Sequence, residues 1–131
     1  MKKILIIEDD EDILNIISIA LGSKYMLLLI KDTNNLLEKM QNFLPDLIIT
    51  DNFTGQKVAA EIINEIKSEN RFSNIPVILF SGHPDIEKLS LEIAAFACIS
   101  KPFSLKDLNV CIETVLASLS VEKEVQGNIN A

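Results

Sequence analysis

The sequence predicts an α/β fold in which a five-stranded parallel sheet of order 2-1-3-4-5 is covered by helices on both faces. Five short apolar runs alternate with five amphipathic stretches, which is typical of parallel strands joined by crossover helices. The runs at residues 47–49 and 77–80 are apolar at every position, as burial on both faces requires. Right-handed crossovers leave few topologies, and we choose the doubly wound one.

The first half of the chain predicts three strands and two helices. Apolar runs place strands at 3–7, 25–30 and 47–50, and amphipathic spacing places helices at 10–21 and 33–43. Gly22 is expected at the end of the first helix and Pro45 just after the second. The inner face of the first helix is expected to carry Ile13, Ile17, Ala20 and Leu21.

The second half predicts two strands and three helices. Strands are expected at 77–80 and 96–100, and helices at 58–69, at 85–93 and from Ser104 onward. The last helix opens with a sequence like a capping box. These elements are expected to form one domain at 1–119, and residues 120–131 are expected to be a helix extension or a disordered tail. The apolar stripe of the last helix comprises Leu105, Leu108, Ile112, Val115 and Leu119.

Composition and charge exclude several classes of protein. A chain of 131 residues suits one core, and its net charge of −7 disfavours sequence-independent nucleic-acid binding. No apolar run is long enough to span a membrane, and acidic residues interrupt the run that follows Lys2 and Lys3 too early for a signal peptide. Cys98 and Cys111 have no metal-ligand spacing and are expected to be reduced thiols. We therefore expect a cytoplasmic protein.

Polar side chains follow four of the predicted strands. Glu8 and Asp9 follow the first strand, Asp51 the third, Ser81 the fourth and Lys101 the fifth. The carboxyl ends of parallel strands meet at one edge of the sheet, where α/β proteins build their sites. Carboxylates crowded together repel one another, and Mg²⁺ would resolve that conflict with oxygen ligands. With an ammonium and a hydroxyl nearby, the set predicts a site where a carboxylate accepts a phosphoryl group.

These residues resemble a known family. Segments 3–10, 45–51, 75–82 and 100–103 are similar to the receiver domain of bacterial two-component response regulators. The resemblance implies a stand-alone, single-domain phosphorelay switch. It implies no enzyme activity beyond self-phosphorylation from small donors and autodephosphorylation. It also implies that a sensor histidine kinase or a histidine phosphotransfer protein is the donor and that a downstream protein is the target, with a homodimer possible.

The resemblance implies a role for each site residue. Asp51 would be the phosphoacceptor, with Ser81 and Lys101 contacting the phosphoryl group, and Lys101 would precede a cis peptide bond. Mg²⁺ would be bound by Asp9 and Asp51 directly and by Glu8 through water. A further ligand would be the backbone carbonyl of Phe53. The partner kinase would dock on the first helix, through Ile19 and Leu14.

Two other functions stay open at this stage. The family usually has Met, Pro and Gly where this chain has Thr54, Gly55 and Ala59. It also usually has an aromatic residue three positions before the lysine, where this chain has Cys98. These departures favour a receiver-like interaction module that does not use phosphate. A small aspartyl-phosphate phosphatase would want an acid where Phe53 stands, which disfavours that class.

Overall fold

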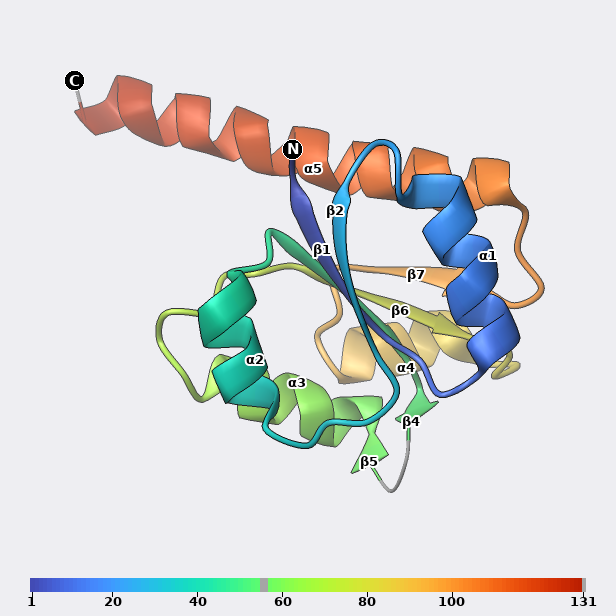
Figure 1. Cartoon of the computed structure of the whole chain (residues 1–131). Coiled ribbons are helices and arrows are strands. Elements are labelled where there is room, and N and C mark those ends of the chain that lie inside the picture. The colour runs from blue at the N-terminus through green and yellow to red at the C-terminus, as the bar shows by residue number, and fades with distance from the viewer. Residues whose placement is uncertain (55–56, 131) are drawn as a thin grey trace.

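The computed structural model describes residues 1–54 and 57–130, with side chains for residues 1–52 and 57–119 (Figure 1). Its main sheet is parallel and has the order β2-β1-β3-β6-β7, which confirms the predicted topology. The predicted strand bounds are correct to within a residue. The strands are β1 (Lys3–Ile7), β2 (Met26–Ile30), β3 (Leu47–Asp51), β6 (Val77–Ser81) and β7 (Ala97–Ser100).

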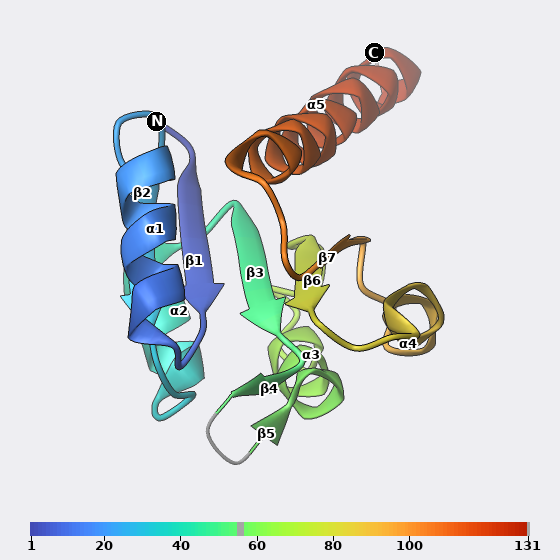
Figure 2. The same ribbon diagram turned by 90° about the vertical axis from the view of Figure 1, so that its right-hand side faces the viewer.

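Both faces of the sheet are buried because successive strand residues point to opposite sides. In β1, Ile4 and Ile6 pack on one side and Leu5 and Ile7 on the other, and all four are fully buried. Each such side chain contributes about 2 kcal/mol through burial. The first face is covered by α1 (Glu11–Leu21) and α5 (Leu105–Asn130), and the second by α2 (Leu36–Phe43), α3 (Ala59–Lys67) and α4 (Ile86–Glu92). Figure 2 shows β1, β3 and β6 running in the same direction.

The second helix begins three residues later than predicted. Asn35 has a left-handed φ of 55°, and the side chain of Asp32 accepts a hydrogen bond from the Asn34 N–H at 2.9 Å. Such a local turn competes with helix formation, so α2 begins only at Leu36. The third helix likewise spans less than the predicted 58–69, but Ile62, Ile63 and Ile66 form its buried face.

A short hairpin that the sequence analysis did not predict follows β3. Strand β4 (Phe53–Thr54) pairs antiparallel with β5 (Lys57–Val58). Its base is closed by the Ala59 N–H, which donates to the Asn52 carbonyl at 2.7 Å. Gly55, one of the departures from the family pattern, lies outside the described residues. The hairpin joins the end of β3 directly to the start of α3.

The last helix begins as predicted. The Ser104 hydroxyl accepts a hydrogen bond from the Asp107 N–H at 3.0 Å, as a capping residue does. Leu108, Ile112 and Val115 are buried, whereas Leu105 in the first turn is exposed. The helix continues to Asn130 and extends past the sheet (Figure 1). In the described part of the chain, no helix is long and apolar enough to cross a membrane.

Candidate functional site

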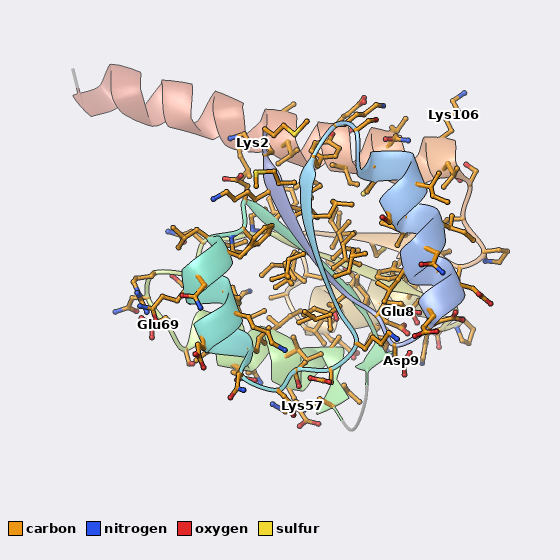
Figure 3. All side chains as sticks on the ribbon, viewed as in Figure 1. Lys2, Glu8, Asp9, Lys57, Glu69 and Lys106 are labelled. Carbon is orange, nitrogen blue, oxygen red and sulfur yellow. The ribbon has the colours of Figure 1, made fainter. Side chains whose placement is uncertain are left out.

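The structure places the predicted site residues at the carboxyl edge of the sheet. Glu8 and Asp9 follow β1, and Figure 3 shows them together at that edge. Asp51 ends β3 and Ser81 ends β6, while Lys101 follows β7 directly. The registers align Asp51 with Phe80 and Ser81 with Ser100, so the ends of neighbouring strands lie close to one another.

Three carboxylates crowd this edge. One oxygen from each of Glu8, Asp9 and Asp51 lies within 4.8 Å of the others. Glu8 is only 1% exposed, Asp51 is half-buried and Asp9 is exposed. The Glu8 Oε2 atom is buried and has no hydrogen-bond partner among the described residues. A buried acceptor without a partner is costly, so this atom marks a position where a cation or its water fits.

One ammonium group joins two of the carboxylates. Lys101 Nζ lies 3.3 Å from Glu8 Oε1 and 3.3 Å from Asp51 Oδ2. It also lies 4.7 Å from the centroid of the Phe80 ring, whose face attracts a cation. A single positive charge cannot neutralise three carboxylates, so the cluster keeps an excess of negative charge.

The pKa of Glu8 reflects both its burial and the neighbouring negative charge. The pKa of Glu8 is raised from 4.5 to about 7, most of all by burial and then by the neighbouring Asp51 carboxylate. The ammonium of Lys101 opposes this shift only in part. A divalent cation would relieve the same repulsion that favours the proton.

The two loops beyond Ser81 and Lys101 shape the rest of the site. Ser81 is nearly buried, and its Oγ accepts a hydrogen bond from the His83 N–H at 3.1 Å. The hydroxyl proton of Ser81 therefore remains available to a ligand oxygen. The peptide bond between Lys101 and Pro102 is cis, which confirms the prediction.

Sequence reasoning missed two supporting contacts. The Asn52 N–H donates to Asp51 Oδ1 at 2.7 Å and orients that carboxylate. Phe80 supports Lys101, and the Phe103 ring packs edge-on against Phe80 with centroids 6.0 Å apart. Phe80 directly precedes Ser81 and Phe103 follows Lys101 by two residues, and this closeness in sequence is the signal that could have identified them. For Phe53, the structure describes the backbone in β4 and not the side chain.

An apolar groove adjoins the site. Its volume is about 480 Å³, and Lys101 contributes to its lining. Ile19 is 84% exposed on α1, as expected. Leu14 is 6% exposed and packs in the core, so its prediction as a docking residue is wrong. The other groove residues are Ile13, Ile16, Pro102, Phe103 and Leu105.

Residues 4–113 match the family described as the response regulator receiver domain. The chain belongs to that family. This match includes residues of every strand of the main sheet and all the predicted site residues. The family assignment establishes a receiver domain of two-component phosphorelay signalling, and it agrees with the geometry described above.

Curated relatives carry this domain within longer proteins. The chain is 28% identical over 118 residues to the sensor histidine kinase TmoS of Ectopseudomonas mendocina, covering 88% of this chain and 12% of that protein. It is 32% identical over 115 residues to the histidine kinase P4 of Formosa agariphila, covering 86% of this chain and 8% of that protein. The chain thus spans about a tenth of the length of these relatives.

Solved structures share the fold. NtrX from Brucella abortus is 24% identical with a TM-score of 0.84, covering 96% of this chain and 29% of that one. The chemotaxis protein CheY4 of Vibrio cholerae is 21% identical with a TM-score of 0.79, covering 88% of this chain and 98% of that one. These similarities confirm the receiver fold.

Proposed function

We propose that Asp51 accepts a phosphoryl group from the phosphohistidine of a histidine kinase or a histidine phosphotransfer protein. The observation that carries this proposal is the contact of Lys101 Nζ with both Glu8 and Asp51 at 3.3 Å, beside the oxygen cluster at the sheet edge. A half-buried carboxylate held between an ammonium and a backbone N–H is oriented for attack on phosphorus.

The transfer would form one bond and break one. An Asp51 carboxylate oxygen attacks phosphorus, the P–N bond to the donor imidazole breaks, and the imidazole leaves and takes up a proton. The three equatorial oxygens of the transferring group gather negative charge. Lys101 would bind one of these oxygens, and Ser81 would donate its hydroxyl proton to another.

The acidic cluster fits Mg²⁺. Glu8, Asp9 and Asp51 offer hard oxygen ligands, and the buried Glu8 Oε2 lacks a partner among the described residues. When bound, Mg²⁺ would supply positive charge to the phosphoryl oxygens. We propose that Asp9 and Asp51 bind it directly, Glu8 through water, and the carbonyl of Phe53 as a further ligand.

The groove beside Lys101 offers a surface for the phosphodonor. Exposed Ile16 of α1 and Leu105 of α5 flank this groove. Ile19, also on α1, projects into solvent. An amphipathic helix of the donor would place its apolar face here while its histidine reaches Asp51. Replacing Ile19 with Asp should slow transfer from a cognate kinase and leave transfer from a small donor intact. Equal loss in both reactions would refute this docking role.

Intact-mass measurement tests the central proposal. The protein is incubated with Mg²⁺ and acetyl phosphate or phosphoramidate, and the expected result is the gain of one phosphoryl group. The Asp51→Ala variant should gain none, whereas Asp107→Ala, a matched change on exposed α5, should behave as wild type. A wild-type protein that is folded and gains nothing would contradict the proposal and favour the phosphorylation-independent interaction module.

We propose that the protein acts as a phosphorylation switch and not as an enzyme that converts a substrate in repeated cycles. Steady consumption of the small donor would indicate the phosphatase alternative. The chain resembles parts of longer kinases and regulators, so the kinase partner, the downstream target and a cytoplasmic location are proposals of the same kind.

A further inference from the structure

One edge of the main sheet carries an unbroken apolar strand. Strand β2 forms hydrogen bonds with β1 alone, so its other side is an edge. Its five residues are Met, Leu, Leu, Leu and Ile, without a charge, a proline or a glycine. Proteins usually protect an edge strand with charges, prolines or bulges, because free backbone groups pair with other strands. Strand β2 has none of these protections.

The backbone groups that point outward can be identified. The Met26 N–H donates to the Lys2 carbonyl at 2.9 Å, and the Ile30 carbonyl accepts from the Glu8 N–H at 3.0 Å, so both residues face β1. Backbone N–H and carbonyl groups of successive residues point to opposite sides of a strand. Leu27 and Leu29 therefore direct their N–H and carbonyl groups toward the open edge, and these groups have no partner in the described part of the chain.

The open edge is accessible. Figure 1 shows β2 crossing between α1 and α2 with no other segment drawn over it. A groove of about 330 Å³ lies between α1 and this strand, lined by Leu14 and Asn15 on the helix and by Leu29 on the strand. Met26 is 48% exposed, and the three leucines of the strand are only partly buried. The strand is therefore open to contact beside α1.

We propose that β2 pairs antiparallel with β2 of a second copy of this chain, which would join the two sheets through a two-fold axis at Leu28. In that register Leu27 of one copy faces Leu29 of the other, so the outward backbone groups meet and form about four hydrogen bonds. The two Leu28 side chains lie beside each other at the axis. Such a contact is isologous and closes on itself, so it stops at a dimer.

Charge complementarity favours a second copy of this chain as the partner at the open edge of β2. Lys24 precedes β2 by two residues and Asp32 follows it by two, so an antiparallel contact centred on Leu28 brings Lys24 of each copy near Asp32 of the other. Both side chains are exposed and flank the apolar strand, and Lys24 makes no ion pair in the described part of the chain. The contact therefore brings opposite charges together at each of its two ends.

Sedimentation of the full chain over a concentration range tests the association. Wild type should approach twice its 14.6 kDa mass as concentration rises. Lys24→Glu and Asp32→Lys should each weaken the dimer at least about tenfold, because like charges then face each other, and the double variant should recover it. Lys88→Glu, the same charge change on exposed α4, should have no effect. A folded chain that stays monomeric throughout overturns the proposal and leaves the edge to a strand of another protein.

Disulfide trapping tests the register independently. In a Cys98→Ser/Cys111→Ser background, Leu28→Cys should form a covalent dimer with glutathione disulfide, because residues facing across a non-hydrogen-bonded pair lie close enough to be bridged. The two thiols are oxidised and glutathione disulfide is reduced to two thiols. Met26→Cys should cross-link far more slowly, since it faces Ile30 of the second copy. Equal cross-linking at both positions, or none at Leu28, would overturn the register.

Discussion

The burial of Glu8 beside Asp51 allows a quantitative prediction of how Glu8→Gln changes the stability of the fold. The pKa of Glu8 is raised from 4.5 to about 7, first by burial and then by Asp51. A carboxyl group whose pKa is raised in the folded state stabilises the fold fully below its unfolded pKa, and that contribution is lost as pH rises through the folded pKa. Glu8 therefore destabilises the metal-free protein above about pH 7, by up to about 3 kcal/mol at 1.36 kcal/mol for each pKa unit.

Glutamine has nearly the same shape and keeps an oxygen for Lys101, while its amide can donate to Asp51. In a chelating buffer at pH 8, Glu8→Gln should unfold at a higher temperature than wild type, by up to roughly 3 °C for each kcal/mol. Near pH 5 the difference should largely vanish, because wild-type Glu8 is then protonated. Thermal unfolding followed by circular dichroism measures both.

Glu87→Gln is a matched control on exposed α4, and its effect should stay within about 0.5 kcal/mol at either pH. Addition of Mg²⁺ at pH 8 should stabilise wild type and narrow the gap to Glu8→Gln. An equal gap at both pH values, or a less stable variant at pH 8, would show that burial and Asp51 do not raise the pKa of Glu8.

Three further predictions follow from the site and its supports. The apparent Mg²⁺ affinity, measured by calorimetric titration, should fall by up to tenfold for each pH unit below about 7, because the cation competes with the proton on Glu8; a flat profile would contradict this. Lys101→Met should slow phosphorylation by acetyl phosphate about 10²- to 10³-fold in intact-mass kinetics, and a rate near wild type would remove Lys101 from the site. Asp10→Ala should cost about 1 kcal/mol in urea unfolding, because Asp10 Oδ1 accepts the N–H groups of Asp12 and Ile13 at the start of α1.

The sheet order and the residues at its edge could be predicted because they depend on local patterns. Apolar runs at 47–49 and 77–80 identify central strands, and each polar residue that ends a run is carried to the same edge by parallel pairing. The depth of each carboxylate could not be predicted from sequence. Glu8, the first residue after β1, is buried, whereas Asp9, the next residue, is exposed.

The face of α1 was harder to predict because apolar residues occupy most of its positions. Stripes through Ile13 and through Leu14 both fit a helical period. The structure buries Leu14 with Ile17 and Leu21, and it leaves Ile13 at the groove beside Lys101. Tertiary packing decided between the two stripes. The hairpin of β4 and β5 was missed for another reason: its strands have two residues each, too few to show an alternation.

The position of Lys101 connects the chemistry of the site to its surroundings. Its ammonium lies equally far from Glu8 and Asp51, so binding a phosphoryl group on Asp51 would draw it toward the new oxygens and weaken its contact with Glu8. Phe80 stacks under this ammonium and Phe103 packs against Phe80, and Phe103 also lines the apolar groove. We therefore expect a shift of Lys101 to change the shape of the groove, which would let a donor bound there leave once transfer is complete.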